Sequence, residues 1–389
     1  MSLITRRSAL AVIAAGSCAA GLQVRPGCAV TADFDQSTAW PSFRRTPDLR
    51  GIATTVLAAD PQLLWEFRSK DGWVGVCAIV DDHVYAPALE GFLYCLDRRT
   101  GTVIWKYRSI DSPDEDEFAP GFKAAPLVTS EAVYAGDEDG ILHVVDRKSG
   151  ERRWQFTTEA EIAGGVAIWK DRLIVASHDS WLYCLSLDGD EVWKFQTNDR
   201  INCSPAIADH YTFVAGCDSQ LRVIDLEQGE EVLGVEMGDY LIASPAVVDD
   251  VLYVGSHGGE VSAVNWKDGT AVWSYSGRRQ LSIRASAVAT DDLILVGSHD
   301  KLMHAIDRRT GVPRWTFPTR ARIESSAAVV DSRVFFGSGD GNIYGLSVAD
   351  GSQQWKFNAG HAISAGIAIG EECLVVGEDD VNGRLLCFT

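Results

Sequence analysis

The chain has 389 residues, and its 54 acidic side chains outnumber its 35 basic ones to give a formal net charge of -19. A surface this negative repels phosphate backbones, which argues against a nucleic-acid partner. Hydrophobic residues make up 46% and charged residues 23%, a balance that supports a large globular core and excludes disordered and fibrous classes.

Residues 1–32 have the pattern of a secretory signal peptide. Arg6 and Arg7 precede a short apolar stretch, and small residues follow at two sites where cleavage is expected, near Ala20 or near Ala32. The paired arginines are typical of signals that the twin-arginine export machinery reads. The apolar stretch is too short to predict a membrane span, so we expect none in the mature protein.

Cys18 offers an alternative way for the signal to end. The run Ala15-Gly16-Ser17-Cys18 is weakly similar to a bacterial lipobox, in which the cysteine becomes the acylated first residue. Alanine stands here where that motif usually has leucine. With either ending, the pattern predicts an exported protein.

Residues 33–61 precede the repeats and form a lead-in that contains Trp40-Pro41 and Thr46-Pro47. Proline restricts its own backbone and that of the residue before it, so an extended path is expected. We predict that this lead-in wraps over one face of the folded body.

Tryptophan marks a repeat through residues 62–389. The markers are separated by 40, 49, 39, 80, 42 and 40 residues, and Leu233 stands at the midpoint of the gap of 80. The extra residues in the interval of 49 belong to an acidic loop, Asp111–Glu117. Eight markers therefore exist, of which seven are tryptophans: Trp65, Trp105, Trp154, Trp193, Trp273, Trp315 and Trp355.

Four short runs of β-branched and aromatic residues recur around each marker, with turn residues between them. No segment keeps a helical apolar period over three turns, so little helix is expected. Four strands in about 40 residues are the composition of a propeller blade. The predicted fold is an all-β, eight-bladed β-propeller of four-stranded antiparallel blades.

The two ends of the repeat are incomplete in complementary ways. The first copy, Gln62–Phe67, supplies only a fourth strand, and the last copy stops after its third strand at Thr389. The N-terminal strand is therefore expected to complete the C-terminal blade, which closes the ring and removes exposed sheet edges.

The cysteines show no CxxC pair and no zinc spacing. Cys95, Cys184 and Cys387 share a repeat position that small apolar residues usually fill, which predicts core packing. Cys203 and Cys217 flank a predicted hairpin, where they could form a disulfide if the strands set them opposite each other.

Histidines and carboxylates were considered as metal ligands. His178, His257 and His299 occupy one turn position in three different blades, too far apart for shared ligand bonds, and are predicted to be turn residues. The acidic loop Asp111–Glu117 lacks the spacing of a preformed calcium site and is predicted to be solvated. No metal site is predicted.

The channel mouth follows from the repeat alignment. Lys123, Asn202, Arg284 and Glu324 are its polar residues, which could hold a small ligand. No nucleophile, base and oxyanion site can be assembled from them, so no catalytic residue is predicted. The aligned positions are Val74, Lys123, Ala163, Asn202, Ile242, Ile283, Glu324 and Ser364, followed by a mostly small position that includes Arg284.

The repeat resembles a known signature. Cys95 to Trp105 and Ala305 to Trp315 are similar to A-x-D-x-x-T-G-x-x-x-W, the signature of the pyrroloquinoline-quinone-type (PQQ-type) propeller repeat. The resemblance covers residues 40–389. It implies that each tryptophan ring docks on a neighbouring blade, positioned by the Thr-Gly turn.

Two branches of this family are relevant. Quinoprotein dehydrogenases bind PQQ and calcium, tend to be longer and often carry adjacent cysteines, which this sequence lacks. The other branch is similar to the outer-membrane assembly lipoprotein BamB, with short loops and no chemistry. The resemblance to it implies a non-catalytic scaffold at the periplasm or outer-membrane periphery, without a cofactor, that binds an envelope protein on one face. A small PQQ- and calcium-dependent dehydrogenase and a ligand-sensing propeller are the alternatives.

Overall fold

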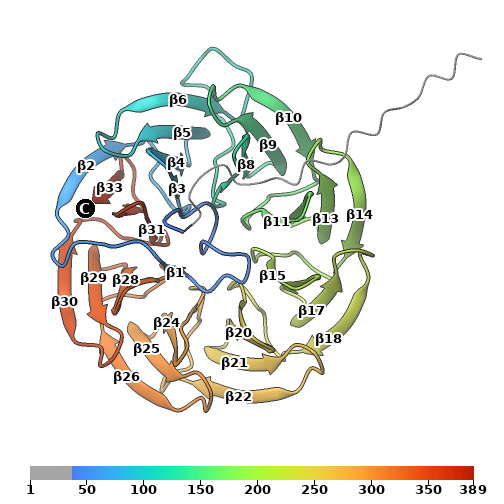
Figure 1. Ribbon diagram of the computed structural model, residues 1–389, viewed down its shortest axis with the longest axis vertical. Coiled ribbons are helices and arrows are strands. Elements are labelled where there is room, and N and C mark those ends of the chain that lie inside the picture. The colour runs from blue at the N-terminus through green and yellow to red at the C-terminus, as the bar shows by residue number, and fades with distance from the viewer. Residues whose placement is uncertain (1–36) are drawn as a thin grey trace, which may run out of the picture.

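The computed structural model describes residues 37–389. The predicted signal peptide, its cleavage sites and Cys18 lie outside the described residues. Eight sheets surround a central axis (Figure 1), and each contains four consecutive antiparallel strands apart from the two modifications given below. The prediction of an all-β, eight-bladed propeller is confirmed.

The first four blades follow one another along the chain. Blade 1 contains β3 (Ala78–Val80), β4 (His83–Pro87), β5 (Phe92–Asp97) and β6 (Val103–Arg108). Blade 2 contains β7 (Leu127–Val128), β8 (Ala132–Gly136), β9 (Ile141–Asp146) and β10 (Arg152–Thr157). Blade 3 contains β11 (Ala167–Trp169), β12 (Arg172–Ala176), β13 (Trp181–Ser186) and β14 (Glu191–Gln196). Blade 4 contains β15 (Ala206–Ala208), β16 (Tyr211–Ala215), β17 (Gln220–Asp225) and β18 (Glu231–Glu236).

Blades 5–7 continue the pattern, and blade 8 closes it. Blade 5 contains β19 (Ala246–Val248), β20 (Val251–Gly255), β21 (Glu260–Asn265) and β22 (Ala271–Ser276). Blade 6 contains β23 (Val288–Ala289), β24 (Leu293–Gly297), β25 (Leu302–Asp307) and β26 (Pro313–Pro318). Blade 7 contains β27 (Ala328–Val330), β28 (Arg333–Gly337), β29 (Asn342–Ser347) and β30 (Gln353–Asn358). Blade 8 contains β31 (Ala368–Gly370), β32 (Cys373–Gly377), β33 (Arg384–Phe388) and the N-terminal β2 (Leu63–Arg68).

The ring closes as predicted. Strand β2 pairs antiparallel with β33, and Trp65 lies opposite Cys387 in this register. A second N-terminal strand, β1 (Ile52–Ala53), pairs parallel with β27 and becomes the innermost strand of blade 7. The N-terminal segment thus supplies the outermost strand of blade 8 and an additional innermost strand of blade 7.

Burial differs between inner and outer strands because blades pack face to face. The third strands, such as β17, are buried along most of their length, since a neighbouring blade covers each face of the sheet. The outermost strands, such as β18, alternate between exposed and half-buried residues. This difference explains why the third strands read as continuous apolar runs and the fourth strands as alternating ones.

The seven marker tryptophans each donate the indole N–H to a backbone carbonyl in the next blade. Trp105 is representative: its Nε1 lies 3.1 Å from the carbonyl oxygen of Arg147. Its ring lies against Gly150, where φ is 73° and an added Cβ would come within 2.6 Å of the ring. Glycine is therefore required at this turn both for its backbone angle and for the close approach of the ring.

The joint between blades 4 and 5 is built differently, because Leu233 replaces the tryptophan. Here Trp266, in the turn of blade 5, packs back onto blade 4. Its ring centroid lies 5.5 Å from that of Tyr211 and 5.3 Å from that of Phe213. Trp266 is 5% exposed. An aromatic ring is thus kept at this joint, but the opposite blade supplies it.

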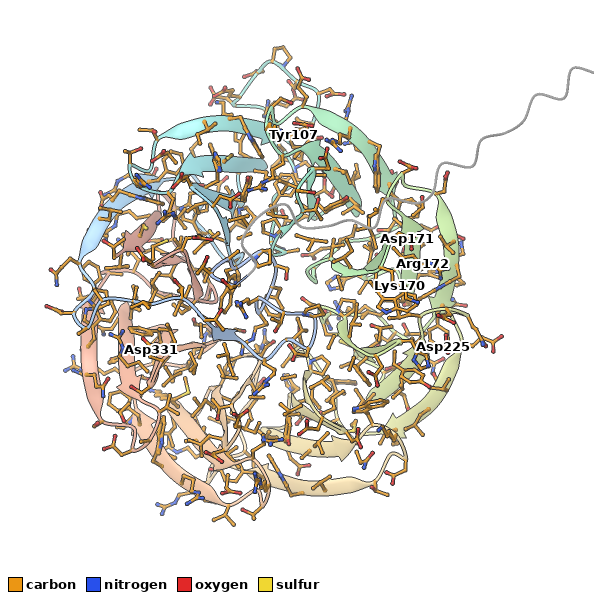
Figure 2. The ribbon with its side chains drawn as sticks, in the orientation of Figure 1. Tyr107, Lys170, Asp171, Arg172, Asp225 and Asp331 are labelled. Atoms are coloured by element: carbon orange, nitrogen blue, oxygen red, sulfur yellow. The ribbon has the colours of Figure 1, made fainter. Side chains whose placement is uncertain are left out.

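Polar contacts also join neighbouring blades, as between blades 3 and 4. The Lys170 ammonium lies 3.1 Å from a carboxylate oxygen of Glu227, and Arg172 donates to the Leu226 carbonyl oxygen over 3.0 Å. Figure 2 labels Lys170 and Arg172 at this edge of blade 3. Exposed ion pairs such as the one between Lys170 and Glu227 contribute little to stability.

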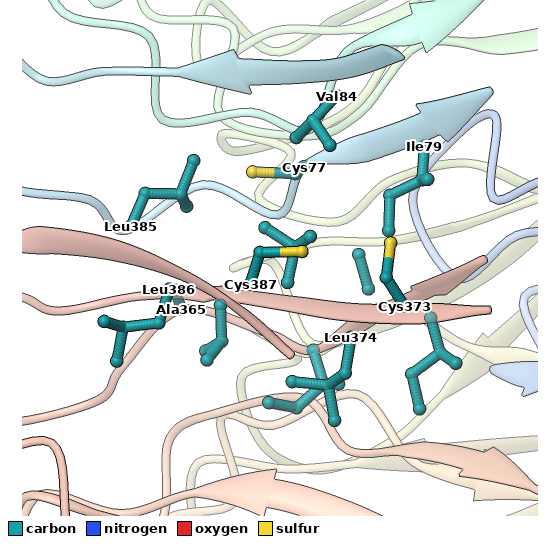
Figure 3. Packing of buried hydrophobic residues seen from close by; sticks show 14 of the residues in the cluster. Cys77, Ile79, Val84, Ala365, Cys373, Leu374, Leu385, Leu386 and Cys387 are labelled. Carbon is teal, nitrogen blue, oxygen red and sulfur yellow. The ribbon is translucent and has the colours of Figure 1, made fainter. Parts of the chain in front are cut away.

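The buried cysteines pack in the core. Figure 3 shows the sulfur atoms of Cys77, Cys373 and Cys387 among aliphatic side chains at the joint between blades 1 and 8. Cys95 and Cys184 are buried as predicted, and burial raises the pKa of their thiols to about 12 and about 11. Such thiols are poor nucleophiles because the reactive form is the thiolate.

The structure does not form the predicted disulfide, since Cys203 and Cys217 are both free. The isolated bridge between Ile201 and Gly216 sets the register, which places Arg200 opposite Cys217. The two sulfur atoms have different partners: Cys203 Sγ accepts from the Ala215 N–H over 3.2 Å, and Cys217 Sγ accepts from the Asn202 amide over 2.7 Å. The sequence located the hairpin but not its register.

Among residues 37–389, no helix is long and apolar enough to cross a membrane.

Candidate binding face and axial channel

The two faces of the ring are built from different connections. Strands alternate in direction, so the loops between blades and the second hairpin turn of each blade lie on one face, called here the open face. The first and third turns of each blade lie on the other face, called here the capped face because the lead-in covers its centre (Figure 1).

The lead-in binds the innermost strands of seven blades through its backbone. Its carbonyl oxygens accept hydrogen bonds from one N–H in every blade except blade 3. The pairs, acceptor first, are Thr38 and Glu371, Trp40 and Ile79, Pro41 and Val128, Pro47 and Ile207, Asp48 and Val247, Arg50 and Ala289, and Gly51 and Val329. The lead-in covers one face, as the sequence predicts, and its backbone also pairs with the innermost strands of the blades.

Arg44 reaches into the axis from the lead-in and is 1% exposed. Its guanidinium donates to the carbonyl oxygens of Ala327 and Ala287, the second over 2.7 Å, and no carboxylate is among its hydrogen-bond partners. Burial lowers the pKa of Arg44 to about 9. Gly51 leaves the space that the guanidinium fills. Sequence patterns could not predict this buried cation, because a single arginine in a polar lead-in belongs to no periodic pattern.

Four serines link the innermost strands around the channel. The Ser204 hydroxyl oxygen accepts from the Gly165 N–H over 2.8 Å. Ser204 donates its own N–H to the Ser244 hydroxyl over 2.8 Å, Ser244 to Ser286 over 3.0 Å, and Ser286 to Ser326 over 3.0 Å. These hydrogen bonds connect blades 3–7 at the channel, where no β-ladder joins one blade to the next. The regular spacing of the serines was visible in the sequence.

Three of the four polar residues predicted at the channel mouth line the axial channel: Lys123, Asn202 and Arg284. The Lys123 ammonium lies 2.6 Å from Glu138 and 3.3 Å from Glu161. Burial alone would lower the pKa of Lys123, but the hydrogen bond that Lys123 donates to Glu138 and the charges of both glutamates outweigh burial and raise that pKa. Lys123 therefore stays protonated, and two carboxylates within the mouth balance its positive charge.

The structure corrects two positions in the predicted mouth. Ile283 is 3% exposed and packs beneath Gly255, so Arg284 takes its place in the channel. Glu324 lines a separate cavity rather than the channel, and its Oε1 lies 2.9 Å from His299 Nε2. The loop before blade 6 holds additional residues, which shifted the alignment by one position.

The axial channel does not fit a PQQ and calcium pair. Its volume is about 160 Å³, below the 300–1,000 Å³ typical of small-molecule sites. No carboxylate is among the described residues that line it, whereas calcium requires six to eight oxygen ligands.

A larger cavity, of about 910 Å³, lies off the axis on the open face and spans blades 5–8. Basic side chains gather in its wall: His257, His299, Lys301, Arg320 and Arg322. The cavity adjoins the channel, since Ser364 lines both. Sequence reasoning treated the two histidines only as turn residues and did not bring these arginines together, because they belong to successive loops.

The remaining candidate ligands are engaged with neighbours. His178 lies 3.5 Å from Glu161, and burial lowers the pKa of this histidine despite the nearby carboxylate. Within the part of the chain that the structure describes, no three histidine, cysteine, aspartate or glutamate side chains are grouped so that they could hold a metal ion.

The acidic loop projects from the rim between β6 and β10 (Figure 1). Three of its carboxylates contact cations from the surrounding strands and loops. These pairs are Asp111 with Arg152 at 2.8 Å, Glu115 with Lys106 at 2.6 Å, and Asp116 with Lys70 at 2.7 Å. The loop is exposed, but it carries less free negative charge than its sequence suggests.

Comparison with known proteins extends these observations. The sequence matches the family described as "Outer membrane protein assembly factor BamB" over residues 50–163, 138–282 and 276–385. No curated protein sequence matches the chain.

Several solved structures share the fold. BamB from Moraxella catarrhalis is 18% identical, with a TM-score of 0.70 over 85% of this chain and 97% of its own. The computationally designed protein Ika8 is 16% identical, with a TM-score of 0.73 over 84% of this chain and 99% of its own. Quinohemoprotein alcohol dehydrogenase from Comamonas testosteroni is 12% identical, with a TM-score of 0.76 over 91% of this chain and 80% of its own.

At these identities the structural matches show the fold alone, because scaffolds and enzymes share it. The match to the family model is stronger evidence of family membership, because it spans nearly the whole ring. This chain belongs to the BamB-like family of PQQ-type β-propeller repeat proteins.

Proposed function

We propose that this protein is a non-catalytic binding scaffold of the cell envelope, with a BamB-like role in outer-membrane protein assembly. The observation that carries the proposal is the difference between the two faces. The lead-in covers the centre of the capped face with backbone hydrogen bonds to seven blades. The open face keeps its loops and a large cavity accessible, so it is the surface that we assign to a partner.

An exposed aromatic residue supports this assignment. Phe118, at the end of the acidic loop on the open face, is 81% exposed. Aromatic side chains are enriched at the centres of protein interfaces, where burial of their large apolar area stabilises the complex. The signal-peptide pattern and the family both favour the periplasm or the outer-membrane periphery as the place where such a partner would be met.

The test is affinity capture of the tagged mature protein from envelope extracts, with captured proteins identified by mass spectrometry. We expect a component of the β-barrel assembly machinery to be enriched. Phe118→Ser should reduce this enrichment, whereas Val56→Ser, which changes a residue 68% exposed in the lead-in on the capped face, should not. Repeated captures without any assembly component would contradict the proposal.

The shared fold with a quinohemoprotein dehydrogenase calls for a second measurement. The purified protein should be incubated with PQQ and calcium, separated from free cofactor and assayed for dye-linked oxidation of alcohols and sugars. We expect neither calcium-dependent retention of PQQ nor oxidation, because the axial channel is small and no carboxylate is among the described residues that line it. Retained cofactor together with oxidation would replace the scaffold proposal by the enzymatic alternative.

A further inference from the structure

We propose that the cavity across blades 5–8 on the open face binds a small organic anion with an apolar body. This inference does not depend on the scaffold proposal, because it concerns a ligand site rather than a protein partner. It rests on three observations about the cavity wall: its unpaired cations, a buried hydroxyl without a partner, and the size and apolar character of the remaining surface.

The cations come first. Lys301 and Arg320 line the cavity, and among the described residues neither has a carboxylate within the 4.0 Å of an ion pair. Both therefore add positive charge without a paired carboxylate to the wall of one cavity, although the chain as a whole carries a net charge of -19. An anion in the cavity would supply the missing partner, and charge-assisted hydrogen bonds are the strong ones.

The two acidic residues in the wall do not fill this role. Glu324 lies 2.9 Å from His299 Nε2 and accepts from Arg322 Nε over 3.0 Å. Asp379 accepts from the Ser364 hydroxyl over 2.8 Å. Both carboxylates are therefore held by neighbours within the wall, and Lys301 and Arg320 remain available to a ligand.

Ser282 is the second observation. It is 9% exposed and lines the cavity, and its hydroxyl oxygen is buried without a hydrogen-bond partner among the described residues. A buried hydroxyl without a partner costs free energy that a bound ligand would recover. The hydroxyl thus marks a second point of the wall where a polar group of the ligand is expected.

The third observation sets the chemical class. The volume of about 910 Å³ lies within the range of sites for drug-sized molecules and far exceeds an inorganic anion. Leu281, Ala321, Ala362 and Ile363 contribute apolar surface to the wall, and Leu281 is 43% exposed. A bare phosphate would leave that surface in water, whereas an anion with an apolar body would cover it.

The test uses the fluorescent anion 8-anilinonaphthalene-1-sulfonate with the whole mature protein. We expect saturable binding that the double charge reversal Lys301→Glu with Arg320→Glu weakens about tenfold or more. The matched control is Arg99→Glu with Arg309→Glu, which changes the net charge equally in two exposed turns on the capped face, outside the cavity. Equal dye affinities for both double variants would overturn the proposal.

A filling variant tests the cavity without changing charge. Ala362→Trp should abolish dye binding while urea unfolding shows a folded ring, and dodecanoate should displace the dye from the unchanged protein. Inorganic phosphate should not displace it, since phosphate lacks the apolar body. If only an acetylated peptide of alternating leucine and glutamate displaces the dye, the cavity belongs to an acidic segment of a partner protein and the small-molecule proposal is wrong.

Discussion

The indole N–H of Trp355 donates to the carbonyl oxygen of Pro61 across 3.1 Å and so joins blade 7 to the segment that leads into β2. The two residues are 294 positions apart in the sequence. In the other tryptophan joints the acceptor belongs to the turn of a complete blade. Here the acceptor comes from the N-terminal end of the chain, because β2 is the outermost strand of blade 8.

Trp355→Phe removes this hydrogen bond but keeps most of the ring packing. Trp355 is 7% exposed and Pro61 is buried, so the carbonyl loses its donor in a site that water does not reach. We expect the free energy of unfolding to fall by about 1–3 kcal/mol. Trp154→Phe should lower the free energy of unfolding by less, as measured by urea unfolding. This substitution leaves the Leu187 carbonyl without its donor, but Leu187 lies in a half-buried turn that water can reach. Equal losses would argue against this reason.

A pair of glycine variants separates backbone strain from contact with the tryptophan. Gly150 and Gly269 have φ of 73° and 76°, so alanine is strained equally at both. At Gly150 an added Cβ would lie 2.6 Å from Trp105, whereas at Gly269 the nearest atom, on Val235, is 3.2 Å away. We expect Gly150→Ala to lower the free energy of unfolding by about 1–3 kcal/mol more than Gly269→Ala. Equal thermal midpoints would contradict the contact.

Two N-terminal truncations test what closes the ring. Removal of residues 1–51 takes away most of the cap but keeps β2, so we expect a monomer of lower stability with the same blades. Removal of residues 1–69 leaves β33 with an unpaired edge, which favours association with other chains. Size-exclusion chromatography and circular dichroism should show a folded monomer only for the shorter truncation. A folded monomer without β2 would contradict this account of closure.

Acid should weaken the turns that receive the tryptophans. The Arg153 guanidinium lowers the pKa of Asp146 to about 2, and the Thr310 hydroxyl lowers that of Asp307 to about 2, from an ordinary 3.8. A carboxyl whose folded pKa is depressed stabilises the protein above about pH 4 and loses this effect as the pH falls towards about 2. We expect the urea midpoint to decrease over this interval.

The control for the acid dependence is a comparison of variants. Asp146→Asn with Asp307→Asn should flatten the decrease of the midpoint, and Asp188→Asn, in an exposed turn, should leave it unchanged. The effect of each turn is small because both carboxylates lie near solvent, where screening reduces the interaction. A double variant with the same pH slope as the unchanged protein would exclude the two turns as its source.

The sequence predicted the ring well because the repeat is long and its two ends are complementary. It could not predict that Arg44 is buried against the inner strands, because Arg44 lies outside the repeat. It also could not predict that Trp266 replaces the docking ring lost at Leu233, because Arg147 and Leu226 fill the same repeat position in other blades. Compensation across a joint depends on packing between two blades, and a one-dimensional alignment does not contain that information.

The channel and the cavity show a second limit of sequence reasoning. The repeat alignment predicts both Ile283 and Arg284 at the channel mouth, but a shift of one residue turns a strand position over, and only Arg284 lines the channel. The cavity across blades 5–8 is lined by residues from successive loops, and these residues are not spaced at the period of the repeat. Its members, such as Lys301 and Arg320, become neighbours only when the blades are set around the axis.

The pairing of β2 with β33 also orders events in time. Ribosomes release the lead-in and β2 first, yet their partners include strands at the far end of the chain, such as β33. Strand β2 must therefore wait without its native partner strand until synthesis is almost complete. Strand β2 is made before any blade is complete and finds its place last, so a chain interrupted before β33 cannot close the ring.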